Sequence, residues 1–182
     1  CTFCPTDIYY GHKVRIRNPE TIVDEIQWVK EKTQVEDFLF WTESFTLNKD
    51  FAYTVCEEII KRNLNIRWVC NSRVDDVDLP LLRKFKRAGC WMIGYGVESG
   101  SQEVLNKARK GITLQQTMDA CKLAKQAGLE VTAHVIFGLP GETKQTAVET
   151  IEFVKRLDVD YGQFYCAVPF PGCELYEMAK AN

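Results

Sequence analysis

The sequence predicts an α/β fold with parallel strands, because five strand-like segments alternate with amphipathic helical segments along its 182 residues. Connections that contain a helix favour parallel strands joined by right-handed crossovers. No linker or low-complexity tract divides the chain, so one domain of ordinary size is expected. This alternation is compatible with a doubly wound sheet and with a barrel.

The individual elements follow from periodicity and from helix-end signals. In the first helix, Ile22, Val23, Ile26 and Val29 share one face, and the opposite face is charged. Asn48 is a favourable N-cap for the second helix. The expected strands are residues 37–41, 66–70, 91–97, 130–137 and 161–168, and the expected helices begin near Pro19, Asn48, Asp78, Gln102, Thr113 and Thr143.

Two helices are expected to end in the same way, with cations followed by an Ala-Gly pair. These endings are residues 86–89 and 125–128. Cations stabilise the C-terminal end of a helix, and glycine commonly follows it. The similarity is consistent with repeated βα units.

Composition excludes several classes of protein. Hydrophobic residues make up 46% of the chain and charged residues 26%, as in average soluble globular proteins. The net charge is −2 with no basic block, which argues against nucleic acid as the partner. No apolar run approaches the roughly 20 residues that span a bilayer. Six of the eight cysteines are scattered, and Cys56, Cys90 and Cys121 have the pattern of buried thiols, so a reducing, cytoplasmic location is expected.

Cys1 and Cys4 form the one CxxC pair of the chain. Spacing alone leaves three roles open: an iron–sulfur ligand pair, a zinc ligand pair or a redox dithiol. Zinc usually requires a second ligand pair, and no other CxxC or HxxxH is present.

Several motifs then occur in a fixed order: the Cys1–Cys4 pair with Phe3 before its second cysteine, and residues 15–26, 42–46, 94–100, 137–143 and 169–176. Together they resemble the radical S-adenosylmethionine (radical SAM) superfamily, in particular its cobalamin-associated branch. The resemblance covers essentially all 182 residues. The family signature is CxxxCxxC, so Cys1 and Cys4 correspond to its second and third cysteines, and the first is expected before Cys1.

The resemblance implies a [4Fe-4S] cluster held by Cys1 and Cys4, with S-adenosylmethionine bound beside it. Thr42 and Glu43 are expected at the methionine amino group, since both can accept its protons. The family often has Gly-Gly-Glu here, and this chain has Trp41 and Thr42 before the acid.

The remaining site residues are assigned in the same way. Ser72 and Arg73 follow the second strand, and the Arg73 guanidinium suits the methionine carboxylate. A salt bridge from Arg73 to Asp75 or Asp76 is the alternative. The other positions implied by the resemblance are Glu98 and Ser99 at the ribose, and Phe3 and Gly138 near the adenine. His134 and Tyr165 lie in strands, where structural roles are more usual.

In fold, the resemblance implies a partial (βα)6 TIM-like barrel that here lacks its first strand. Residues 1–168 are expected to form the radical SAM core, and residues 169–182 a C-terminal extension that begins a helix or linker. The strand at residues 37–41 is then an edge strand, and an exposed edge favours pairing with a second copy.

In function, the resemblance implies generation of a 5′-deoxyadenosyl radical for hydrogen abstraction or methyl transfer on a small-molecule substrate. A reducing protein such as flavodoxin or ferredoxin is the expected partner, and cobalamin is expected through a separate domain. The alternatives are a methylthiotransferase or porphyrin-oxidase type of radical SAM enzyme, and a non-catalytic or zinc-stabilised α/β module. With two of three cluster ligands, this chain is expected to be inactive when isolated.

Overall fold

The structure is a computed structural model that describes residues 1–11 and 13–181. Its five strands form one sheet in the order β1-β2-β3-β4-β5, and every neighbouring pair is parallel. The predicted α/β class and the parallel strands are therefore confirmed. The strands are β1 (Asp37–Phe40), β2 (Arg67–Ser72), β3 (Cys90–Glu98), β4 (Glu130–Phe137) and β5 (Tyr161–Cys166).

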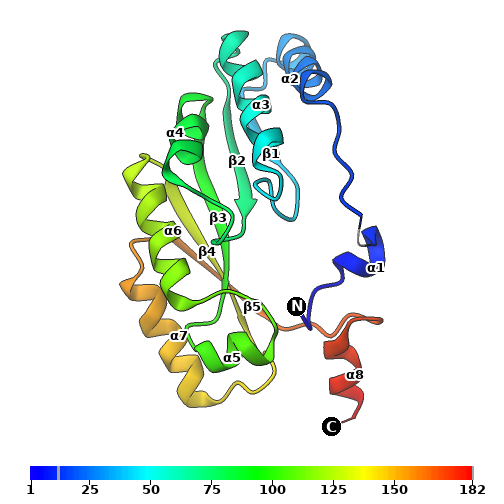
Figure 1. The fold of residues 1–182 in the computed structure, drawn as a ribbon, viewed down its shortest axis with the longest axis vertical. Coiled ribbons are helices and arrows are strands. Elements are labelled where there is room, and N and C mark those ends of the chain that lie inside the picture. Colours follow the sequence, from blue (N-terminus) through cyan, green and yellow to red (C-terminus); the bar gives the residue numbers. More distant parts are fainter. Residues whose placement is uncertain (12, 182) are drawn as a thin grey trace.

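Helices connect each strand to the next (Figure 1). The six that the sequence predicts are present within a few residues of the expected positions. They are α2 (Pro19–Thr33), α3 (Lys49–Lys61), α4 (Leu79–Arg87), α5 (Gln102–Lys107), α6 (Leu114–Gln126) and α7 (Lys144–Arg156). A short helix that the sequence analysis does not predict, α1 (Thr6–Tyr10), follows the cysteine pair, and α8 (Glu174–Lys180) lies in the predicted C-terminal extension.

The strand order decides between the two sheet architectures that the sequence leaves open. A doubly wound sheet reverses its strand order at a switch point. Here the spatial order is the chain order from β1 to β5, with no reversal. Right-handed crossovers then place successive helices on the same side, which is the arrangement of TIM-like folds.

Hydrophobic side chains fill the space between the sheet and these helices. On β3, Ile93, Tyr95 and Val97 are fully buried in this core. Since side chains alternate across a strand, Gly94 and Gly96 lie on the opposite face of the sheet. We call that opposite face the open face.

Helix starts carry the capping residues that the sequence indicates. The Asn48 side chain accepts a hydrogen bond from the Phe51 amide, and Asp78 caps α4 in the same way. Thr113 and Thr143 each form a capping box. Such caps stabilise a helix by typically about 1 kcal/mol each, because they satisfy amide groups that have no partner within the helix.

Strand β1 is an edge strand of the described sheet, since it pairs with β2 alone. The predicted edge position is therefore confirmed. Of the helices in the described part of the chain, none has the length and hydropathy needed to cross a membrane.

Candidate functional site

Two glycines of β3 create room for polar side chains on the open face. A Cβ at Gly94 would lie 2.4 Å from Asn71 Oδ1 of β2 and 2.6 Å from His134 Nε2 of β4. These distances are shorter than real Cβ contacts, so glycine is required for both side chains to occupy their positions. Asn71 and His134 therefore meet above the middle strand.

The same arrangement recurs two residues further along β3. A Cβ at Gly96 would lie 2.6 Å from Glu98 Oε1 and 2.8 Å from Lys110 Nζ. Lys110 donates to Glu98 across 2.6 Å, and both side chains are about nine-tenths buried. The two glycines thus support one continuous polar cluster, which we call the open-face cluster: Asn71, Glu98, Lys110 and His134.

The backbone at Glu98 departs from regular strand geometry. Its φ is 61°, in the left-handed region, and the register between β3 and β4 shifts between Gly96 and Glu98. This conformation is uncommon for a non-glycine residue. A bulge of this kind redirects side chains at strand ends, and here it directs the Glu98 carboxylate to Lys110.

Arg73 lies beside this cluster, at the end of β2. Its guanidinium donates two hydrogen bonds to the Asp75 carboxylate, at 2.9 and 2.8 Å. A third hydrogen bond reaches the Lys110 carbonyl at 3.3 Å. The hydrogen bonds to Asp75 raise the pKa of Arg73 above its usual value. The alternative salt bridge that the sequence indicates is thus present.

The cysteine pair forms a turn in which Cys1 is exposed and Cys4 is half-buried. The Cys4 amide donates to the Cys1 carbonyl, and the Cys4 thiol lies 2.9 Å from the Thr6 hydroxyl. Thr2, between them, is buried: its amide donates to the Ala108 carbonyl and its own carbonyl accepts from Leu175. The turn is therefore fixed to the end of α5 and the start of α8 (Figure 1).

Phe3 packs against a small apolar cluster that includes Val104, Ala108 and Leu139. Leu139 follows Gly138, whose φ of 88° is favourable for glycine and whose amide donates to the Glu142 carboxylate. The structure therefore brings Phe3 and the Gly138 turn to the same region, although they are 135 positions apart in the chain.

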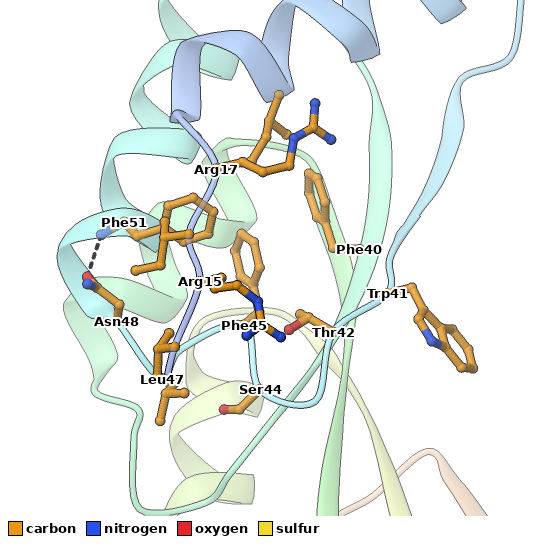
Figure 2. A pocket seen from close by; sticks show the side chains of 13 residues that line it. Arg15, Arg17, Phe40, Trp41, Thr42, Ser44, Phe45, Leu47, Asn48 and Phe51 are labelled. Atoms are coloured by element: carbon orange, nitrogen blue, oxygen red, sulfur yellow. Dashed lines mark hydrogen bonds between the residues drawn. The ribbon is translucent and has the colours of Figure 1, made fainter. Parts of the chain in front are cut away.

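Thr42 and Glu43 follow β1 and line a cavity of about 570 Å³. Thr6 and Asp7, just after the cysteine pair, also line it. A second cavity of about 360 Å³ adjoins the same loop, and Arg15 lines both. Figure 2 shows Arg15 extending toward Thr42 in this second cavity.

A comparison with known families identifies the group to which the chain belongs. Residues 1–154 match the family model described as the radical SAM superfamily. The chain belongs to the radical SAM superfamily.

Relatives and solved structures agree with this. The chain is 36% identical over its full length to the uncharacterized methyltransferase PH0819 of Pyrococcus horikoshii, covering 40% of that protein. It is 32% identical over 97% of its length to the anaerobic magnesium-protoporphyrin IX monomethyl ester cyclase of Rubrivivax gelatinosus, covering 32% of it. It thus spans well under half of these relatives.

Among solved structures, the radical SAM methyltransferase TsrM of Kitasatospora setae, with cobalamin and a [4Fe-4S] cluster bound, has a TM-score of 0.82. The match covers 91% of this chain and 32% of that one, at 21% identity. At this identity the likeness shows a common fold.

The thiolates of Cys1 and Cys4 suit an iron–sulfur cluster in a radical SAM protein. Within residues 1–11 and 13–181, no group of three or more His, Cys, Asp or Glu side chains could hold a metal ion. The two cysteines therefore fit part of a ligand set. The open-face cluster fits a polar ligand, since neither the Asn71 side chain nor His134 Nε2 has a hydrogen-bond partner among the described residues, and both lie over Gly94.

Two predicted site residues lie away from the open-face cluster. Ser99 is fully buried, and its hydroxyl lies 3.1 Å from the Thr150 hydroxyl of α7 and accepts from the Ser101 amide. Ser72 is buried, and its hydroxyl has no partner in the described chain. It lies on the strand face that carries Trp68 and Cys70 of the core.

No sequence pattern predicts a site role for Asn71 or Lys110. Neither belongs to a motif with a fixed spacing to a known chemistry. The two glycines at Gly94 and Gly96 were the available signal, because they indicate close approach to the sheet. The glycines do not predict which side chains approach the sheet. In the structure the approaching side chains come from β2, from β4 and from the loop after α5.

Proposed function

We propose that this chain is the catalytic core of a radical SAM enzyme, with a [4Fe-4S] cluster at Cys1 and Cys4 and S-adenosylmethionine across the C-terminal ends of β1 to β4. The observation that carries the proposal is the open-face cluster. Its polar side chains come from the C-terminal halves of β2, β3 and β4 and from Lys110, which lies two residues after the Ala108 carbonyl that accepts from the cysteine turn. Parallel α/β folds bind their ligands toward this end of the sheet. When bound, the reduced cluster supplies the electron that cleaves S-adenosylmethionine to a 5′-deoxyadenosyl radical, for hydrogen abstraction or methyl transfer.

The loop after β1 is proposed to hold the methionine amino group. Glu43 and Thr42 line a cavity that reaches the residues after the cysteine pair, and carboxylate and hydroxyl oxygens accept hydrogen bonds from an ammonium. Arg73 is proposed to bind the carboxylate. Because Asp75 already occupies two of its donors, this requires a remaining N–H of the guanidinium or an exchange of partners.

The nucleoside is proposed to lie along β3 and the Gly138 turn. Glu98 offers carboxylate oxygens to ribose hydroxyls, and Phe3 and Gly138 flank the adenine. Ser72 and Ser99 complete the predicted set, and their burial favours support of the strand ends over direct contact.

The third cluster ligand is proposed to be the first cysteine of the family signature, before Cys1. A separate cobalamin domain is proposed as well, supported by the cobalamin-bound TsrM structure and by the relative named as a methyltransferase. Residues 1–168 are proposed as the core and 169–182 as an extension, of which Asn182 lies outside the described residues.

A small-molecule substrate, a cytoplasmic location and a reducing partner such as flavodoxin or ferredoxin complete the proposal. Pairing of two copies through β1 is proposed for the isolated chain, since this edge is unpaired in the described sheet.

The test is metal analysis of the full-length protein reconstituted anaerobically with iron and sulfide. We expect four iron and four sulfide per chain, and loss of most of both in Cys4→Ala. The matched control is Cys166→Ala, which removes the exposed thiol at the end of β5 and should load fully. Zinc without iron, or equal loading of both variants, would favour the zinc-stabilised module instead.

A further inference from the structure

We propose that Tyr165 and Gln163 are positioning residues that hold His134 in the Nδ1–H tautomer, so that its Nε2 accepts a hydrogen bond from a ligand on the open face. The ligand chemistry is that of a hydroxyl or amino donor. The identity of the ligand rests on the proposed function, whereas the tautomer does not.

A chain of two hydrogen bonds carries the first step. The Tyr165 hydroxyl donates to Gln163 Oε1 across 3.0 Å, and it lies 3.2 Å from His134 Nδ1. A tyrosine hydroxyl has a single proton. Since that proton is directed to Gln163, the contact with His134 requires Nδ1 to be the donor.

The position of Nε2 carries the second step. A Cβ added at Gly94 would lie 2.6 Å from His134 Nε2 and 2.4 Å from Asn71 Oδ1. The two polar atoms are therefore neighbours on the open face. None of the described residues hydrogen-bonds to Nε2 or to the Asn71 side chain. Two polar groups without a protein partner therefore lie side by side over Gly94, where a hydroxyl or amino donor of a ligand could bind to both.

The surroundings favour a neutral imidazole. Burial lowers the pKa of His134, and the Lys110 ammonium acts in the same direction, while the Glu98 carboxylate opposes both. Because Lys110 is paired with Glu98, the opposing charge is partly neutralised. A neutral imidazole with Nδ1 protonated keeps a lone pair on Nε2.

The test is ¹⁵N NMR of the histidine side chains, which is simple to interpret because the chain has two histidines. We expect a protonated Nδ1 and an unprotonated Nε2 for His134. In Tyr165→Phe, the population should shift toward the Nε2–H tautomer. The control is Tyr161→Phe on the same strand, whose hydroxyl lies near Glu130, and it should leave both resonances unchanged.

Two results would overturn the proposal: an Nε2–H tautomer in the unmodified protein, or no response to Tyr165→Phe in a variant with normal circular dichroism. Titration with S-adenosylmethionine then distinguishes the sources of the donor. A shift of the Nε2 resonance on binding would support a donor on the cofactor, and an unchanged resonance with measured binding would contradict that source. The tautomer result stands even if the protein forms no deoxyadenosine, so the two proposals fail separately.

Discussion

Lys110 Nζ lies 2.6 Å from Glu98 Oε1, and the two side chains expose only 10% and 9% of their surface. Lys110 comes from the loop after α5, whereas Glu98 ends β3 in a left-handed conformation. Desolvation of both charges is costly, and their mutual attraction offsets it only while both are present. The pair therefore makes the shape of the open face dependent on a single loop residue.

Removing the Lys110 ammonium should destabilise the protein strongly. Lys110→Met leaves the Glu98 carboxylate buried without its cation, which costs about 3–5 kcal/mol in such pairs. Urea denaturation measures the difference. The control Lys155→Met breaks an exposed pair with Glu152 and should change the free energy of unfolding by less than about 1 kcal/mol. Equal effects of the two variants would show that burial of the Lys110 pair has no energetic consequence.

Gly94→Ala should weaken ligand binding while preserving the fold. The added methyl group displaces Asn71 and His134 from their present positions. We expect at least tenfold weaker binding of S-adenosylmethionine, about 1.4 kcal/mol, by equilibrium dialysis of the cluster-loaded protein. Gly162→Ala on β5 is the control, because its nearest contact is the Phe164 ring at 3.1 Å. An unaffected affinity in Gly94→Ala would remove the main support for a ligand on the open face.

Ser99→Ala should affect stability more than affinity. The Ser99 hydroxyl satisfies the Ser101 amide and contacts Thr150 in the core, so its loss should cost about 1–3 kcal/mol of unfolding free energy. Binding of S-adenosylmethionine should be unchanged. A large loss of affinity at unchanged stability would instead support the ribose role that the family resemblance implies.

His134 should contribute a pH dependence to stability. Its pKa is lowered in the folded protein, by burial first, while the unfolded value is about 6.5. Well above about pH 6.5, the imidazole is neutral in both the folded and the unfolded protein. As the pH falls through about 6.5, the unfolded chain binds the proton first, so the free energy of unfolding decreases until the lower folded pKa is reached.

Thermal or urea unfolding between about pH 7.5 and about pH 5 measures this slope. His134→Gln should show a smaller loss of stability over that interval. Glu98, Lys110 and Tyr165 also face the imidazole, so Tyr165→Phe serves as a second variant that leaves the titrating group in place. An identical slope in His134→Gln would contradict the assignment.

Most of the fold follows from local sequence signals. Asn48, Asp78, Thr113 and Thr143 mark helix starts because each side chain caps its own helix, independently of the rest of the chain. Strand β4 agrees at both ends with the prediction. Helix α1 was missed because its five residues follow Pro5 with no apolar period of their own and no side-chain cap.

The site was predictable in outline and not in its contacts. Glycines within a strand, here Gly94 and Gly96, indicate close approach to the sheet, and Phe3 packs against the cluster that contains Leu139, beside Gly138. The partners of Glu98 and His134 could not be predicted. They depend on the parallel register of β2, β3 and β4 and on a bulge, which are set by long-range packing rather than by neighbours in the chain.

The most direct measurement is electron paramagnetic resonance of the reduced full-length protein, with and without S-adenosylmethionine, together with an assay for 5′-deoxyadenosine. A radical SAM core predicts a reduced-cluster signal that changes when the ligand binds, and deoxyadenosine that forms only with cluster and reductant present. A cluster signal that does not change when S-adenosylmethionine is added would contradict the assignment as a radical SAM core. A protein that carries zinc and no cluster would contradict it as well. In that case the chain would share the fold of the superfamily without its chemistry.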